Sequence, residues 1–197
     1  MQDLSTMLPE PLASLIREHR MIEEVVGDAR AAIGQAAIPG AAQDVIDTGL
    51  EAVRNLFAFM QADLTVHIAK EEKVLFPALE DLNDVTDLAI EDMFVQHDAV
   101  RERHALLEKT LAAIEEGHDE VHAEQAGIAH HLASTETGVT FELLAALKDN
   151  VTRLDWILQG HFGDEEDDVF VPAEELLPAS RFPELVSEMA ALEARLL

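Results

Sequence analysis

The chain has 197 residues, and its 40 Asp and Glu against 13 Lys and Arg give a formal net charge of −27. Hydrophobic residues make up 48%, which is enough for a core, and this length favours one domain. The negative charge argues against nucleic acid and anionic membrane surfaces, which require basic patches. The absence of cysteine excludes disulfides, thiolate catalysis and Cys-ligated zinc or iron–sulfur sites, and the absence of tyrosine excludes a tyrosyl radical.

The sequence lacks the usual signals for membranes and export. No run approaches about 18 uninterrupted apolar residues, the length that a membrane span requires. The N-terminal residues MQDLSTMLPE contain no basic region followed by an apolar run, as a secretory signal would. We therefore expect a cytoplasmic protein.

The periodicity of apolar residues predicts an all-α fold. Long stretches are rich in Ala, Leu, Glu and Met, and no alternation typical of strands is present. Four stretches repeat apolar residues at i, i+3, i+4 and i+7, and they are 12–33, 53–74, 90–114 and 144–165. Such helices pack as a bundle, so we predict an up-down-up-down four-helix bundle over residues 1–177. Residues 178–197 are expected to add a short C-terminal helix flanking the same domain. Residues 118–138 either extend the third helix or cross over to the fourth.

Six polar residues occupy positions on the apolar faces of these helices. They are His19, His67, Glu71, His97, His161 and Glu165. Burying an unpaired carboxylate or imidazolium costs several kcal/mol, so these residues require a shared partner. A metal ion would neutralise the carboxylates and accept the imidazole lone pairs. The sequence therefore predicts a metal site in the core of the bundle.

Two of the helices carry the same motif. A His-x-x-x-Glu pair presents a nitrogen and an oxygen on one helix face, one turn apart. His67 and Glu71 form one such pair, His161 and Glu165 form another, and in both cases a second Glu, a Phe and a Pro follow. The first and third helices each offer a single His. Since diagonal helices of an up-down-up-down bundle are parallel, like elements would face each other across the site.

This pattern resembles the hemerythrin-like, HHE cation-binding family over roughly residues 10–172. The matching residues are His19, His67-x-x-x-Glu71, His97 and His161-x-x-x-Glu165. The resemblance implies a left-handed four-helix bundle that holds a non-haem di-iron site with terminal His ligands and bridging Glu71 and Glu165. It also implies chemistry of O₂, NO or peroxide, or sensing of iron and oxygen. A ferritin-like site is set aside, because its Glu-x-x-His spacing occurs only at Glu115–His118.

The sequence departs from the oxygen carriers of that family after the His of the third helix. Where those carriers have a second His one turn on, this chain has Arg101, whose guanidinium cannot ligate a metal. We expect Arg101 to pair with Glu23 or to hydrogen-bond a bound oxygen species. Glu23 is a candidate third carboxylate ligand, with a salt bridge to Arg20 or Arg101 as the alternative. His104, two turns after His97, is expected above the metals, where it or Arg101 would act in catalysis.

The identity and role of the metal stay open between alternatives. We expect two iron ions. The alternatives are one iron ion, a zinc ion, or a metal that works beside an organic redox cofactor such as a flavin. The chain would either turn over its ligand, as a peroxidase-like, catalase-like or NO-handling oxidoreductase, or sense oxygen, iron or redox state without turnover. We expect a small diatomic or peroxide ligand, no nucleic acid and no membrane, and leave open whether the chain forms an oligomer.

Two further sets of residues are interpreted as solvated. Glu72 and Glu166 lie off the apolar faces and are expected to be exposed to water, with a role as ligands five residues after each histidine as the alternative. A second histidine cluster, made of His118, His122, His130 and His131, is expected on an acidic linker, with adventitious zinc or nickel binding by His118 and His122 as the alternative.

Overall fold

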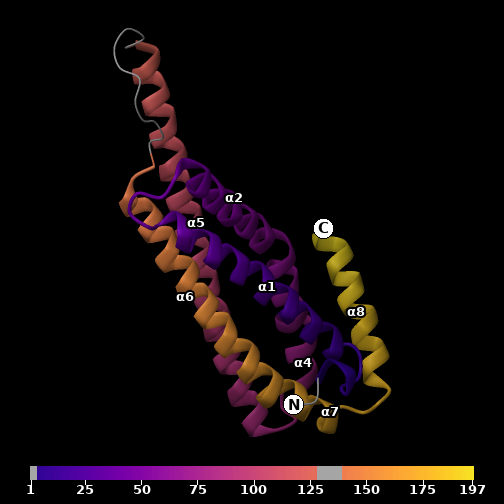
Figure 1. The fold of residues 1–197 in the computed structure, drawn as a ribbon. Coiled ribbons are helices and arrows are strands. Elements are labelled where there is room, and N and C mark those ends of the chain that lie inside the picture. Colours follow the sequence, from indigo (N-terminus) through magenta and orange to yellow (C-terminus); the bar gives the residue numbers. More distant parts are fainter. Residues whose placement is uncertain (1–3, 128–138) are drawn as a thin grey trace.

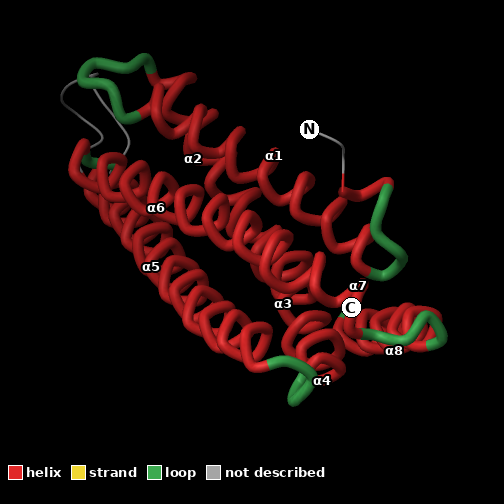
Figure 2. The backbone as a smooth tube through the Cα atoms, turned by 90° about the horizontal axis from the view of Figure 1, so that it is seen from below, coloured by secondary structure: helices red, strands yellow, loops and turns green. Residues whose placement is uncertain are grey.

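The prediction of an all-α fold is confirmed. A computed structural model describes residues 4–127 and 139–197, with side chains for 4–116 and 139–197, and in these residues it contains helices and no strand (Figures 1 and 2). The helices are α1 (Leu12–Ala36), α2 (Gln43–Phe59), α3 (Thr65–Lys70), α4 (Phe76–Leu79), α5 (Asp84–Gly127), α6 (Phe141–Glu165), α7 (Val171–Leu176) and α8 (Arg181–Leu196). Within this part of the chain, no helix is both long and apolar enough to cross a membrane.

Four helical segments run side by side along the molecule (Figure 1). One is α1, the second is α2 continued by α3 and α4, the third is α5, and the fourth is α6 continued by α7. Helix α1 packs against α2 and α6, and α5 packs against α6 and, less extensively, against α2. The far end of α5 projects beyond its neighbours (Figure 1), so residues 118–127 extend the third helix.

Two apolar clusters fill the interior and leave a polar level between them. The first joins α1, α2, α5 and α6 and includes Ile22 and Val26 on α1. The second lies at the end near α4, α7 and α8 and includes Leu15 and Ile16 on α1. His19 lies between these two pairs on the same helix face, and it is fully buried. The polar layer that contains His19 therefore has apolar side chains on both sides of it, along the axis of α1.

Three π-helical turns interrupt the α-helical segments. They are Met60–Leu64, Glu71–Leu75 and Glu166–Phe170. The second begins at the Glu of the first His-x-x-x-Glu motif and the third begins one residue after the Glu of the second motif, so the internal repeat of the sequence is matched, to within one residue, by a repeat of backbone structure. A π turn inserts one residue into the helix and changes which side chains face inward, and such turns are common at functional sites.

Helix α8 lies outside the four segments, beside α3 (Figure 2). Its buried face consists of Phe182, Leu185, Met189 and Leu192, which join the second apolar cluster. It also contacts the π-helical turn Glu71–Leu75. Residues 181–196 therefore pack directly on the segment that carries the first His-x-x-x-Glu motif.

The close approach of α1 and α2 gives a prediction about stability. A Cβ added at Gly49 on α2 would lie 2.5 Å from the Cβ of Ala36 and 3.2 Å from the carbonyl oxygen of Ala32. We therefore expect Gly49→Ala to lower the free energy of unfolding by about 1–3 kcal/mol through overpacking. Gly27→Ala is the matched control. Its added Cβ meets no atom of the described chain within 4 Å, and alanine is the better helix former, so this change should raise stability by about 0.5–1 kcal/mol. Urea denaturation of both proteins measures the difference, and a stabilised Gly49→Ala protein would contradict the prediction.

Candidate metal centre

The six polar residues of the apolar faces come together at one place. His19 extends from α1, His67 from α3, His97 from α5, and His161 from α6, with Glu71 and Glu165 at the ends of α3 and α6. They form two groups in which the ligand atoms lie within 4.8 Å of one another. The first group is His19, His67, Glu71 and Glu165, and the second is Glu71, His97 and His161. All six residues are buried, and Glu71 belongs to both groups.

Most of the atoms that face the centre lie close together without a hydrogen-bond partner, and the exception is the pair His97 Nε2 and His161 Nε2, which lie at hydrogen-bonding distance, 3.1 Å apart. His67 Nε2 lies 2.7 Å from Glu71 Oε1, and His19 Nε2 lies 3.2 Å from Glu165 Oε2. Nevertheless, these two nitrogens and all four carboxylate oxygens of Glu71 and Glu165 have no hydrogen-bond partner in the described part of the chain. Buried polar atoms are normally paired, so such a set needs an explanation. Imidazole nitrogens and carboxylate oxygens converging on one point are the donors that bind iron or zinc, and these residues fit a metal site.

The outer nitrogen of each histidine is held by another side chain. The pairs are His19 Nδ1 with Glu166 Oε1 (3.0 Å), His67 Nδ1 with Glu18 Oε2 (2.9 Å), His97 Nδ1 with Glu72 Oε1 (2.9 Å) and His161 Nδ1 with Gln96 Oε1 (2.9 Å). A carboxylate or amide oxygen only accepts hydrogen bonds, so Nδ1 of a neutral ring carries the proton and the Nε2 lone pair points inward. This is the usual support of metal-binding histidines, and it orients each ring toward the centre.

Three of these outer partners are carboxylates that also pair with a cation. Arg20 Nη2 lies 2.8 Å from Glu166, Lys70 Nζ lies 3.0 Å from Glu18, and Arg101 Nη2 lies 2.6 Å from Glu72. Gln96, the fourth partner, is neutral and donates to Asp164 at 3.2 Å. The cations hold the carboxylates in place, and such charge-assisted contacts are stronger than neutral hydrogen bonds.

The prediction that Glu72 and Glu166 are solvated is wrong. Glu166 is buried and bonded to His19, and Glu72 is half-buried and bonded to His97. The sequence pattern does not identify Glu18 and Gln96 as part of the site. The sequence does contain a signal for all four partners, since each is adjacent to a candidate ligand. However, each bonds to a histidine on a different helical segment, and sequence adjacency does not reveal that pairing.

Burial and neighbouring charges shift the pKa values of the inner residues, and the direction of the shift differs from one residue to the next. Burial opposes protonation of His67, but the charge of Glu71 raises its pKa to about 9. Burial also opposes ionisation of Glu71, but His67 and its other histidine neighbours hold its pKa well below the usual range. Burial, together with the charge of Glu71, raises the pKa of Glu165 to about 7, and burial lowers that of His161 to about 3. Protons and a metal therefore compete for the same inward-facing atoms.

Glu23, Arg101 and His104 lie outside both groups. Glu23 is partly exposed and pairs with Arg20 at 3.3 Å. Arg101 pairs with Glu72 and with Asp98 rather than with Glu23. The ring of His104 stacks on Phe57 with centroids 4.7 Å apart, and its buried Nε2 has no partner among the described residues. Both Arg101 and His104 line a cavity of about 140 Å³ between α5 and the α2–α3 segment. The second histidine cluster lies outside the described side chains.

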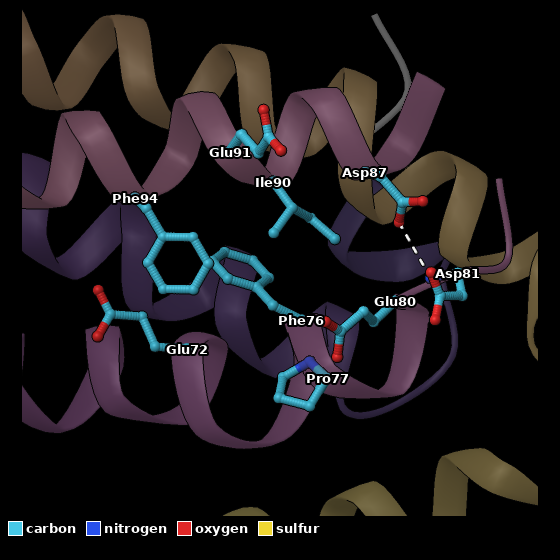
Figure 3. A pocket seen from close by; sticks show the side chains of 9 residues that line it. All are labelled: Glu72, Phe76, Pro77, Glu80, Asp81, Asp87, Ile90, Glu91 and Phe94. Carbon is cyan, nitrogen blue, oxygen red and sulfur yellow. Dashed lines mark hydrogen bonds between the residues drawn. The ribbon is translucent and has the colours of Figure 1, made fainter. Parts of the chain in front are cut away.

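A larger cavity of about 360 Å³ lies between α4 and α5 (Figure 3). The ring of Phe76 forms part of its lining and stacks on the ring of His97, with centroids 6.0 Å apart. Figure 3 shows the Phe76 and Phe94 rings side by side, with the carboxylates of Glu72, Glu80 and Glu91 around them. The acidic lining gives this end of the molecule a potential that attracts cations.

The family of the chain follows from a comparison with protein-family models. The model of the hemerythrin HHE cation-binding domain matches residues 10–139, which is more than half of the chain. The chain belongs to this family. The match includes His19, His67, Glu71 and His97 and ends before His161 and Glu165, which join the site through the geometry of α6. No significant match was found among curated proteins or among solved structures.

Proposed function

We propose that the chain binds two metal ions, iron above all, in an up-down-up-down four-helix bundle formed by residues 1–177 with 178–197 as a flanking helix. The observation that carries the proposal is that Glu71 belongs to both groups of ligand atoms. Glu71 would bridge the two ions, with His19 and His67 on one and His97 and His161 on the other. Glu165 Oε2 lies 3.2 Å from His19 Nε2 and 4.0 Å from His161 Nε2, which supports a second bridging role.

The proposed activity is the binding or turnover of O₂, NO or peroxide. A bound iron pair would supply the redox chemistry that such ligands require. The residues of the chain would do the rest: the outer carboxylates fix the histidine rings, and the apolar clusters above and below exclude bulk water. His104 offers an unpartnered Nε2 in the neighbouring cavity, where it could hydrogen-bond a small ligand. Arg101 would act on the site through Glu72 and His97.

Metal content and a visible spectrum of the same untagged sample test the proposal. Protein expressed with added iron should contain close to two irons per chain and show a ferric charge-transfer band in the near ultraviolet. Peroxide and NO turnover then separate an oxidoreductase from a sensor, because a sensor needs no turnover. One zinc per chain, or the spectrum of a flavin, would contradict the di-iron proposal.

A further inference from the structure

Helix α8 is joined to the metal centre by a chain of charged side chains. Glu193 Oε2 on α8 lies 2.8 Å from Lys70 Nζ on α3. Lys70 Nζ also lies 3.0 Å from Glu18 Oε1 on α1, and Glu18 Oε2 accepts a hydrogen bond from His67 Nδ1 at 2.9 Å. Four side chains from three helices thus connect the C-terminal helix to one of the inner histidines.

Lys70 differs from the other two cations behind the site in its burial. Its side chain is 10% exposed, whereas those of Arg20 and Arg101 are about half exposed, at 53% and 48%. A buried ammonium is costly unless it is paired and hydrogen-bonded, and Lys70 has two carboxylate partners. One of them, Glu193, is supplied by α8. The position of Lys70 therefore depends on α8 in a way that the positions of the two arginines do not.

The end of α8 also covers the outer side of His67. A cavity of about 120 Å³ lies there, and its lining includes His67, Lys70 and Glu18 as well as Glu193 and Leu197 at the end of the chain. If α8 moved away, this cavity would open to solvent at Lys70 and His67. The apolar face of α8 packs into the second cluster and so holds the end of α8, with Glu193 and Leu197, over this cavity.

We propose that docking of α8 and occupancy of the metal centre stabilise each other through Glu193, Lys70 and Glu18, with Lys70 as a positioning residue for His67. This inference rests on the proposed metal binding. A metal at His67 Nε2 requires the ring orientation that Glu18 fixes, and Glu18 is fixed by Lys70. Without Glu193, Lys70 loses one of its two carboxylate partners, so it is held less firmly beside Glu18, and Glu18 in turn holds the ring of His67 less firmly. Because coupling is reciprocal, metal binding must strengthen α8 docking by the factor with which α8 docking strengthens metal binding.

Fe²⁺ titration under anaerobic conditions tests one direction of this coupling. Glu193→Gln removes the link at its partly exposed end, and Glu188→Gln is the matched control, because Glu188 pairs with Arg181 on the same helix at 2.7 and 2.9 Å. We expect Glu193→Gln to weaken Fe²⁺ binding about fivefold and Glu188→Gln to leave it unchanged. Lys70→Met should weaken the binding of one of the two ions by about tenfold or more, and Lys70→Arg should restore most of it.

Hydrogen exchange of residues 181–196 tests the other direction. In the wild-type protein, Fe²⁺ should slow exchange in α8, and this protection should be reduced in Glu193→Gln and kept in Glu188→Gln. A wild-type protein that binds no Fe²⁺ would overturn the proposed function. If the wild type binds Fe²⁺, equal affinities of the two α8 variants, or α8 exchange that does not respond to the metal, would overturn the coupling alone.

Discussion

Replacement of Glu71 by glutamine is expected to abolish binding of both of the proposed metal ions. Glu71 is the residue shared by the two groups of ligand atoms, and it is fully buried with neither oxygen hydrogen-bonded in the described part of the chain. Glutamine keeps the volume but removes the charge and one of the two oxygens, so it cannot bridge two cations. We expect at least a hundredfold loss of affinity. The stabilisation that the wild type gains from metal should disappear as well, because metal binding is linked to folding.

Glu23→Gln is the matched control for this experiment. Glu23 also lies one turn after a candidate ligand, His19, but it is partly exposed, pairs with Arg20 and belongs to neither group. Metal content per chain and the rise in melting temperature on adding Fe²⁺ should match the wild type in the Glu23→Gln protein. If the Glu71→Gln protein still binds two ions, Glu71 does not bridge them. If the Glu23→Gln protein loses metal, Glu23 is a ligand although its side chain lies outside both groups.

The metal-free protein is expected to lose stability as the pH rises from 7 to 9. The pKa of His67 is about 9 in the folded protein against 6.5 as its ordinary value, so the folded state keeps a proton that the unfolded chain releases. The resulting stabilisation is complete below pH 6.5 and is lost as the pH rises through 9. Its size is on the order of 3 kcal/mol. At about 2–4 °C per kcal/mol, the melting temperature should fall by several degrees.

The pKa shifts of Glu165 and His161 affect stability below pH 7. Because the pKa of Glu165 is raised to about 7, its ionisation removes stability between pH 4.5 and 7. Because the pKa of His161 is lowered to about 3, stability is lost in the opposite direction, as the pH falls below 6.5. These two effects on stability offset each other. The pH interval from 7 to 9 therefore reports mainly on the inner histidines whose pKa is raised.

Thermal unfolding at pH 7, 8 and 9, with a chelator and with bound metal, checks this expectation. In the metal-loaded protein, His67 Nε2 carries no proton to release, so the melting temperature should not follow the decline of the metal-free protein. Metal affinity should rise over the same interval. A metal-free protein with a constant melting temperature from pH 7 to 9 would show that His67 is not held protonated by Glu71.

The inner residues of the site could be predicted from the sequence because they interrupt the helical stripes of apolar residues. A helical stripe of apolar residues identifies the buried face, and a histidine or carboxylate on that face is conspicuous. His19, His97 and the two His-x-x-x-Glu pairs were found in this way, and the structure brings all six together. The same argument gave the all-α class, since the stripes have the α-helical period throughout.

The outer residues could not be predicted because they depend on backbone detail and on the packing of one helix against another. In a regular α-helix, adjacent residues point about 100° apart, so the sequence places Glu72 and Glu166 on the solvent side. The π-helical turns at Glu71 and Glu166 change that geometry. The sequence predicts a pairing of Arg101 with Glu23, but Arg101 pairs with Glu72, which follows α3, and Glu23 pairs with Arg20 on its own helix.

The contribution of α6 has a consequence for the order in which the site is assembled. Both groups of ligand atoms require α6, since Glu165 completes one and His161 the other. A chain emerging from the ribosome would have four of the six inner residues long before these two. Cation loading should therefore be a late event, and a bound ion would act as a cross-link that ties the last helical segment of the bundle to the first.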